Sequence, residues 1–327
     1  MNVTIVVTPR ERFSCTVRSL ESIYHHTKIP FKLIYVDGNS PTKVCRYLQQ
    51  QAQAKDFNLI STNYYLSPNH ARNLGLQQVD TEYVVFVDND VIVSPGWLSH
   101  LVDCAEETQA TVVGPLMCQN EPVHEIVHFA GGESHIFQDI KGRRRLREKM
   151  YLQGKKVSEV RDRLKRQETE LAEFHCVLIK MSIFEQLGQL DEAMLNTKEH
   201  LDFCMQVRQA GGKVYFEPDS IVTYVPGPPL KFSDLTYYML RWSDAWVLNS
   251  LNRLREKWDL AEDSYFTTKY KGLGWRRRDS IIQPLAIALT KVTFGKLRYR
   301  LENLLTYWDK KLNRYLTDRH KGIAGKR

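Results

Sequence analysis

The amino-acid sequence predicts an α/β protein in which a mixed sheet is flanked by helices and followed by a helical C-terminal extension. Short apolar runs alternate with helical patterns through the first half of the chain. A proline- and glycine-rich stretch at 226–229 marks a boundary, and the sequence beyond it is aromatic and helical. With 327 residues, 43% of them hydrophobic and 26% charged, the chain can form one large domain with an appendage.

The first half reads as repeated strand–helix–strand units. Apolar runs typical of strands stand at 3–8, 31–37, 57–62 and 82–88, and helical patterns between them are expected at 15–25, 42–53 and 68–78. Ligands of such sheets bind outside the carboxyl ends of the strands. Thr8, Asp37 and Asp88 each stand at such an end, so we expect them to converge on one crevice.

The middle of the chain continues the pattern after an interruption. A helix is expected to about residue 107 and a strand over "ATVVGPLM". A basic insert at about 133–172 follows, then a strand at 176–179, a short helix, a longer helix from "KEHLDF", a Gly-Gly stop and a final strand pair. We therefore predict a first domain at 1–225 that contains the insert, and a helical region at 226–327.

The positive charge is concentrated in one segment. Residues 141–167 hold twelve Lys and Arg against three acids, which accounts for the whole net charge of +8. The segment is interpreted either as a solvated, charged helix face on an inserted loop or as a contact with phosphate or with a membrane. Neutralising Arg143, Arg144 and Arg145 should then weaken binding to anionic lipid. We expect no nucleic-acid partner.

Compartment and anchoring are predicted from what the sequence contains. Its start, "MNVTIVVTPRER", does not resemble a secretory signal, and the six cysteines include no CxxC pair. The apolar runs of the tail are shorter than the roughly 18 residues of a membrane span, and Lys291 interrupts them. We expect a cytoplasmic protein that can work at the inner face of the membrane.

The paired acids Asp88 and Asp90 suggest a metal site. They follow a strand that is otherwise hydrophobic, and residues two apart on an extended chain point to the same side. Two such carboxylates repel each other unless a cation lies between them, and oxygen ligands suit Mg²⁺ or Mn²⁺. A turn or helix-capping role would explain one of these aspartates but not both.

Several motifs together resemble family 2 glycosyltransferases with the GT-A fold, over residues 3–225. They are "VVTPRER", "VDGNS", "ARNLGL", "VVFVDNDVIVSPGWL", "LGQLDE" and "KEHLDFCMQVRQAGG". The resemblance implies a GT-A-type, Rossmann-like sheet. It also implies inverting transfer of a sugar from a UDP- or GDP-linked donor to a hydroxyl of a saccharide or lipid-linked acceptor.

The resemblance also assigns the donor side. It makes Asp88 and Asp90 the DxD motif that holds Mn²⁺ or Mg²⁺ on the donor diphosphate. The other nucleotide-contacting positions that it implies are Thr8, Pro9, Arg10, Asp37 and Arg72. Two alternatives stay open: Asp37 can serve only as a turn residue after its strand, and Arg72 can simply pair with Asp88.

On the acceptor side the resemblance points to Glu199, His200 and Asp202. Members of the family often carry an aspartate where this chain has His200, and a neutral histidine can also act as general base. Alternatively, Asn196 and Glu199 form a capping arrangement at a helix start. Tyr224 stands where a metal-binding histidine is frequent, so metal binding would rest on Asp90, phosphate and water, or on His200.

The remaining histidines, including His175, show no metal-ligand spacing, and His175 is interpreted as a packed strand residue or as part of the acceptor-side wall. Two other functions compete with sugar transfer. A nucleotidyltransferase would need a glycine- and lysine-rich first loop, which "TPRERFS" lacks. A catalytically degenerate GT-A-like protein would bind nucleotide or polysaccharide without turnover. Finally, we expect the basic insert and the tail to lie near one face and to contact an anionic membrane. The alternative, which stays open, is that the tail packs on the catalytic domain or on a second copy of the chain.

Overall fold

The computed structural model describes residues 3–225 and 230–324. Its main sheet has ten strands, with β10, β12, β6, β11, β4, β1, β2 and β3 side by side, β5 paired to β12 and β7 paired to β6. The strands are β1 (Val3–Thr8), β2 (Lys32–Gly38), β3 (Asn58–Thr62), β4 (Tyr83–Asp88), β5 (Val91–Val93), β6 (Val112–Gln119), β7 (Val127–Phe129), β10 (Gln167–Thr169), β11 (Cys176–Lys180) and β12 (Val214–Tyr224).

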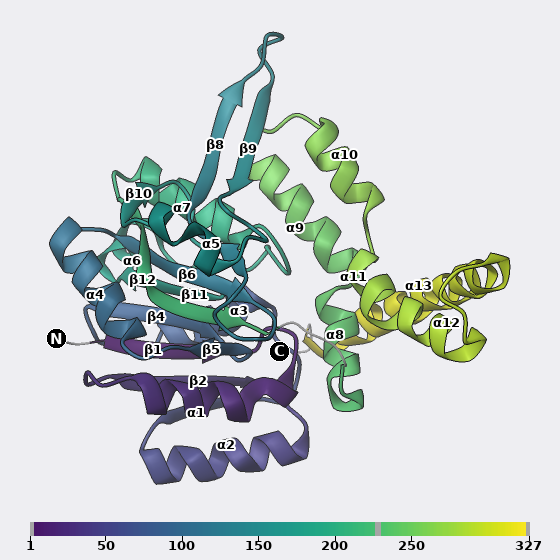
Figure 1. Cartoon of the computed structure of the whole chain (residues 1–327), viewed down its shortest axis with the longest axis horizontal. Helices are drawn as coiled ribbons and strands as arrows, with labels where there is room; N and C mark the ends of the chain where they lie inside the picture. Colours follow the sequence, from purple (N-terminus) through teal and green to yellow (C-terminus); the bar gives the residue numbers. More distant parts are fainter. Residues whose placement is uncertain (1–2, 226–229, 325–327) are drawn as a thin grey trace.

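One half of the sheet is parallel and is built as the sequence predicts. β1 pairs in parallel with both β2 and β4, and β2 pairs in parallel with β3. Helices α1 (Thr16–His26), α2 (Thr42–Lys55) and α3 (Pro68–Leu76) connect these strands, and α1 and α2 lie next to each other below β2 in the view of Figure 1. All six residues of β1 and all six of β4 are buried, because helices or other strands cover both faces.

The other half makes the sheet mixed, as predicted. β11 runs antiparallel to β4, and β12 runs parallel to β6. Helices α4 (Trp97–Thr108), α6 (Ser182–Leu187) and α7 (Glu199–Gln209) belong to this half. The expected final strand pair is instead one long strand, β12, which is interrupted by a register shift between Glu217 and Ile221.

The basic insert is not the charged helix face that its composition favours. Its first part forms an antiparallel hairpin of β8 (Gly132–Gln138) and β9 (Arg144–Met150), followed by the one-turn helix α5 (Val157–Val160). The hairpin projects from the body beside α10 (Figure 1). Several of its basic side chains, and others nearby, are ion-paired within the protein: Arg143 with Asp139, Arg145 with Asp263, Arg147 with Glu133 and Arg166 with Glu217.

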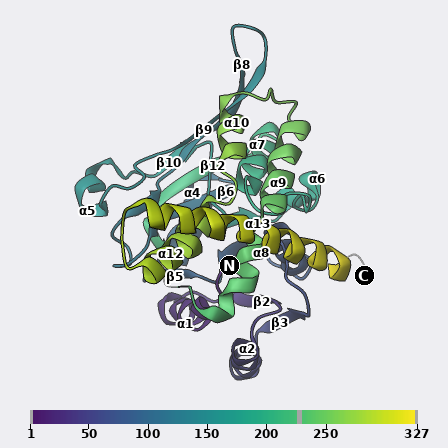
Figure 2. The same ribbon diagram turned by 90° about the vertical axis from the view of Figure 1, so that its right-hand side faces the viewer.

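The C-terminal region is helical, as predicted. It contains α8 (Leu235–Arg241), α9 (Asp244–Lys257), α10 (Ser264–Lys271), α11 (Trp275–Arg277), α12 (Gln283–Thr290) and α13 (Lys296–Ala324). The boundary expected at 226–229 lies outside the described residues. Figures 1 and 2 show α12 and α13 as an arm beside α8 that extends away from the sheet. None of the helices in the described ranges is long and apolar enough to cross a membrane.

Candidate active site

The two predicted metal-binding aspartates follow β4 at the carboxyl edge of the sheet. Asp88 is the last residue of β4, where it pairs with Thr8 of β1, and Thr8 Oγ1 donates to its Oδ1 over 3.4 Å. The turn to β5 is fixed because the Asn89 N–H donates to the Thr8 carbonyl and the Asn89 side chain donates to the Arg12 carbonyl. Asp88 and Asp90, on either side of Asn89, are buried at 1% and 0% exposure.

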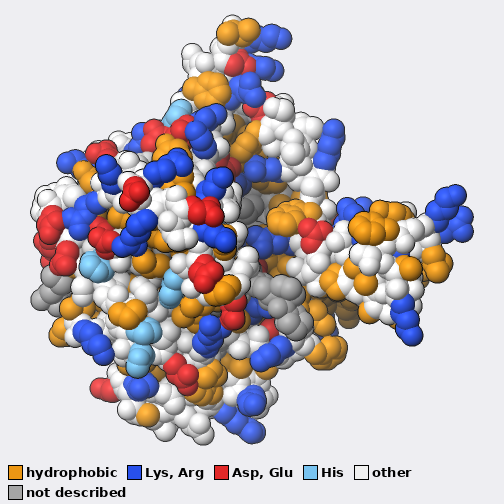
Figure 3. Space-filling model, in the orientation of Figure 1, with side chains coloured by type: hydrophobic (Ala, Val, Ile, Leu, Met, Phe, Trp, Pro, Cys, Tyr) orange, Lys and Arg blue, Asp and Glu red, His pale blue; other side chains and the backbone are white. Residues whose placement is uncertain are grey.

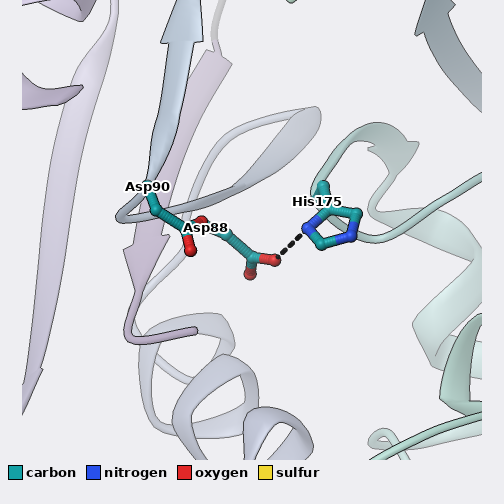
Figure 4. Close-up of side chains that lie close together, drawn as sticks. All are labelled: Asp88, Asp90 and His175. Carbon is teal, nitrogen blue, oxygen red and sulfur yellow. Dashed lines mark ion pairs between the residues drawn. The ribbon is translucent and has the colours of Figure 1, made fainter. Parts of the chain in front are cut away.

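His175 completes a group of three potential ligands with Asp88 and Asp90. Ligand atoms of the three side chains all lie within 4.8 Å of one another, and His175 Nδ1 is 2.9 Å from Asp88 Oδ2 (Figure 4). The backbone explains this placement: β11 runs antiparallel to β4, and the Asp88 N–H donates to the His175 carbonyl. The third potential ligand is thus His175, while His200 is not part of this group.

The carboxylate of Asp90 has the features of a cation ligand. Both of its oxygens are buried, and neither has a hydrogen-bond partner among the described residues. Burial, and then the adjacent Asp88, raise the pKa of Asp90 well above its usual value. A buried polar group without a partner is costly, so a divalent ion that accepts oxygen ligands fits this site.

Three arginines lie around Asp88 and Glu199: Arg72 and Arg241 are buried, and Arg10 is partly exposed. Arg72 Nη2 lies 3.1 Å from Asp88 Oδ1, and Arg10 Nε lies 3.7 Å from Asp88 Oδ2. The distances from Glu199 Oε1 to Arg10, Arg72 and Arg241 are 3.5, 3.7 and 3.9 Å. Burial alone would raise the pKa of Glu199, but the three guanidinium groups outweigh it and lower that pKa. The expected pairing of Arg72 with Asp88 is present, and it places Arg72 beside the metal-binding group.

Arg241 is a residue that the sequence did not single out. It is fully buried, and none of its guanidinium nitrogens has a hydrogen-bond partner among the described residues. Burial, and then Arg10, lower the pKa of Arg241 to about 10, which still leaves it charged at neutral pH. A buried cation in this state favours a nearby anion.

Helix α7 carries the three predicted acceptor-side residues, but they face different surroundings. His200 Nε2 lies 3.5 Å from Glu173 Oε1, and both side chains line a cavity of about 550 Å³. Asp202 instead accepts hydrogen bonds from Trp258 and Lys257 at the end of α9 and does not line that cavity. Glu199 begins the helix among the arginines.

The start of α7 is held by an ion pair instead of the expected cap. Lys198 is the N-cap residue with φ +72°, and its Nζ lies 2.6 Å from Glu148 of β9. Asn196 does not cap the helix, and its amide donates to the Arg241 carbonyl. The hairpin of the basic insert therefore supports the loop that positions Glu199 and His200.

The cavity lies between the sheet domain and the C-terminal helices. From the sheet domain it is lined by Arg10, His128, Glu173, His175 and His200, among others. The C-terminal helices contribute further lining residues, including Trp242, Leu251, Lys269, Trp275 and Arg276. Neither part forms this cavity alone.

The first loop, at Thr8, Pro9 and Arg10, is covered by α8. Tyr237 Oη lies 3.2 Å from the carbonyl oxygens of both Pro9 and Leu66. Next to it, Trp242 Nε1 donates to Glu11 Oε2 over 2.6 Å. The three predicted loop residues are thus together at the sheet edge and largely shielded by the C-terminal region.

Asp37 and Tyr224 are held by local contacts. Asp37, at the end of β2, accepts hydrogen bonds from the backbone and hydroxyl of Ser40, which is the turn role that the sequence left open. Burial raises the pKa of Asp37. Tyr224 donates to Glu11 and stacks on the ring of His175 at 4.1 Å between centroids, so it packs against the potential ligand.

Sequence reasoning missed Glu173 and assigned His175 only to packing or to the acceptor-side wall. The two residues lie in the segment that turns into β11, where Glu173 is next to His200 and His175 is next to Asp88, and both line the cavity. A carboxylate and an imidazole just before a buried strand are the local sequence signal that could have marked Glu173 and His175 as site residues. The register of β11 against β4, which brings them to the site, is not visible in the sequence.

Comparison with known proteins identifies the family. The model of "Glycosyl transferase family 2" matches residues 4–188. The chain is 24% identical over 169 residues to a pre-mycofactocin glycosyltransferase of Mycobacterium tuberculosis, which covers 52% of this chain and 32% of that protein. It is 28% identical over 122 residues to the GalNAc(5)-diNAcBac-PP-undecaprenol beta-1,3-glucosyltransferase of Campylobacter jejuni, which covers 36% of this chain and 39% of that protein.

The chain therefore spans only about a third of the length of these curated relatives. The fold has a solved counterpart in GalNAc-T7, crystallised with UDP, GalNAc and Mn²⁺, with a TM-score of 0.53 and 16% identity over 85% of this chain and 57% of that one. This likeness confirms the GT-A fold with its mixed sheet. Since the family model covers more than half of the residues, the chain belongs to glycosyl transferase family 2.

Proposed function

We propose that the protein is a metal-dependent, inverting glycosyltransferase that moves a sugar from a UDP- or GDP-linked donor to a hydroxyl of a saccharide or lipid-linked acceptor. One observation carries the proposal. A buried carboxylate, Asp90, and a buried guanidinium, Arg241, both lack hydrogen-bond partners among the described residues, and both are close enough to Asp88 to interact with it electrostatically. A divalent cation with a diphosphate would satisfy both groups at once.

The donor side is assigned to residues at the carboxyl edge of the sheet. Asp88 and Asp90, with His175 as a third ligand, would hold Mn²⁺ or Mg²⁺, which when bound neutralises charge on the departing nucleoside diphosphate. Arg10 and Arg72 would turn from Asp88 to the phosphates as the metal takes their place. Asp37, with Thr8 and Pro9, would contact the nucleoside.

The acceptor side is assigned to His200 and Glu173. The imidazole would take the proton of the acceptor hydroxyl while that oxygen bonds to the anomeric carbon and the bond to the diphosphate breaks. Glu173 would stabilise the imidazolium that results, because its carboxylate lies 3.5 Å away. Glu199 is a weaker candidate for the base because three arginines lower its pKa. Asp202, which accepts a hydrogen bond from Trp258 at the end of α9, would only position helix α7.

The names of the relatives support sugar transfer and leave its substrates open. The Mycobacterium protein is named for a pre-mycofactocin acceptor, and the Campylobacter protein is named for an acceptor linked to undecaprenol by a diphosphate. The second name is the reason to include lipid-linked acceptors in the proposal. A degenerate protein that binds nucleotide without turnover is the competing function, because Arg10 and α8 cover the donor side here.

Release of sugar from the donor separates these two functions. Incubation with UDP- and GDP-sugars and Mn²⁺ should release free sugar slowly, since water can replace the acceptor. His200→Gln should reduce that release about 10²-fold while nucleotide affinity stays the same, which is the usual scale for a general base. Nucleotide binding without any release by the parental protein would identify a degenerate binding protein, and full release by His200→Gln would place the base elsewhere.

A further inference from the structure

The long helix α13 differs from an ordinary surface helix in which of its side chains are buried. Surface helices bury an apolar stripe and expose polar residues. In α13 the side chains buried against the protein are polar: Arg298, Glu302, Asn313 and Thr317 are 7%, 4%, 3% and 2% exposed. Their contacts are polar as well, since Arg298 pairs with Glu302 and the Asn313 amide donates to the Met239 carbonyl.

The apolar side of α13 faces outward. Leu297, Leu304, Trp308, Leu312 and Tyr315 are 66%, 54%, 57%, 50% and 60% exposed. With the half-buried Leu301 they recur at intervals of three and four residues, which places them on one stripe of the helix. The stripe continues into α12 and the following loop through Leu285, Leu289, Val292 and Phe294. We call these exposed residues of α12, the loop and α13 the arm surface.

The arm surface collects most of the exposed apolar side chains of the protein. Thirteen of the seventeen exposed large hydrophobic residues in the described part of the chain lie at or after Trp275. Figure 3 shows hydrophobic side chains on the outward arm, with Lys and Arg around them. An apolar patch of this extent with a charged rim is a mark of an interaction site.

The charge around the arm surface selects the partner. Between 278 and 324 the exposed acids are Asp279 and Asp318, while the exposed basic residues are Arg278, Lys291, Lys296, Arg300, Lys310, Lys311, Arg314, Arg319 and Lys321. The other two acids are ion-paired: the buried Glu302 with Arg298, and the half-buried Asp309 with Arg277. A second copy would bring nine basic groups against nine, whereas an anionic lipid surface complements them.

We propose that the arm surface docks on an anionic membrane, lying in the plane of the headgroups without crossing the bilayer. Leucine and phenylalanine side chains would enter the acyl boundary, and Trp308 and Tyr315 would occupy the headgroup level that such rings prefer. Lysines and arginines beside the stripe would contact lipid phosphates. The hairpin of the basic insert contributes little, because its arginines are used in ion pairs such as Arg145–Asp263. We therefore assign the attraction to anionic lipid to the arm and not to the basic insert.

Cosedimentation of the full chain with vesicles tests the proposal without donor, acceptor or turnover, so its outcome is independent of the proposed catalysis. Vesicles with about 30% phosphatidylglycerol should pellet the protein at low salt, and pure phosphatidylcholine should not. The double variant Leu304→Ser, Trp308→Ser should weaken binding at least about ten-fold. Lys311, whose ammonium lies over the Trp308 ring, and Arg319, four residues after Tyr315, are the exposed basic residues next to the stripe. Lys311→Gln and Arg319→Gln should each weaken binding about five-fold and reduce its salt dependence.

Matched controls come from the hairpin. Ile140 is a fully exposed hydrophobic residue and Arg143 an exposed arginine paired with Asp139, so Ile140→Ser and Arg143→Gln should leave vesicle binding unchanged. All substituted side chains on the arm are exposed, and unchanged melting temperatures would verify folding. If the double variant fails to fold, the single variants Lys311→Gln and Arg319→Gln still decide. No pelleting at low salt, or equal losses in the hairpin controls, would overturn the proposal. So would a dimer in solution that Leu304→Ser, Trp308→Ser dissociates without any vesicle binding.

Discussion

Replacing Asp90 by Asn should stabilise the metal-free protein and at the same time abolish its stabilisation by metal and nucleotide. The carboxylate is fully buried without a hydrogen-bond partner among the described residues, and burial and Asp88 raise its pKa. The folded protein then retains a proton that the unfolded chain releases near pH ~4, so stability falls as the pH rises above that value. An asparagine amide does not titrate, so the variant does not lose stability in this way as the pH rises.

The magnitude follows from the burial of an unpaired group, which costs about 1–3 kcal/mol. Unfolding entropy of about 2.1 cal/mol/K per residue makes 1 kcal/mol equal to about 1.5 °C for a chain of 327 residues. Asp90→Asn should therefore melt about 2–4 °C higher than the parental protein in chelator at pH ~8, with a smaller difference toward pH ~4. With Mn²⁺ and UDP or GDP at about 100 times Kd, the parental protein should gain about 2.7 kcal/mol, or about 4 °C, and the variant nothing.

Thermal scans in chelator, and with Mn²⁺ plus nucleotide, provide the assay at each pH. Asp103→Asn, at an exposed aspartate of α4, is the matched control and should change neither measurement. Two results would refute the reasoning. A lower melting temperature of Asp90→Asn in chelator would mean that the charged carboxylate is stabilised by the fold itself, and a retained Mn²⁺-dependent shift would mean that Asp90 is not a ligand.

Two further predictions concern the support of the site. Burial would raise the pKa of Glu148, but its lysine neighbours lower it to about 2, so the stability it contributes is present above about pH 4.5 and lost as the pH falls toward 2. Glu148→Gln should cost about 3 kcal/mol at neutral pH and flatten the acid limb of a denaturation curve; an unchanged acid limb would exclude this ion pair as its cause. A Cβ at Gly75 would lie 2.3 Å from Val6 Cγ1, so Gly75→Ala should destabilise by about 1–3 kcal/mol in denaturant titrations. Gly322→Ala, which meets nothing within 4 Å, should not destabilise, and equal effects of the two changes would contradict the packing argument.

The parallel half of the fold and its polar strand ends were predictable because the signal is local. The apolar runs before Thr8 and Asp88 are strands, and these two residues are direct partners across β1 and β4. Each helix in this half begins within one residue of its expected start, because apolar spacing and Pro68 mark the positions. The family resemblance is confirmed by the family model.

The rest of the site depends on contacts between distant segments. The antiparallel register of β11 against β4 brings His175 to Asp88. Arg241, which contacts Glu199, belongs to the C-terminal region, forty-two residues later in the sequence. The family resemblance grouped Asp202 with Glu199, but Lys257 and Trp258, more than fifty residues later, donate to its carboxylate. The basic insert misled the prediction because composition does not reveal partners such as Asp263, which lies more than a hundred residues away.

The adjacent residues Arg276 and Arg277 of α11 point to different parts of the protein. Arg276 lines the cavity and lies over the Trp242 ring, 4.4 Å from its centroid. Arg277 is buried between Asp309 of α13 and Asp244 of α9, at 2.9 and 3.0 Å. A single turn thus connects the wall of the cavity to the arm, in addition to contacts such as that of Asn313 with the Met239 carbonyl. A ligand in the cavity that favours one position of α11 would change the affinity of the arm surface for a membrane. Thermodynamic linkage requires that membrane binding then change the affinity for that ligand by the same factor.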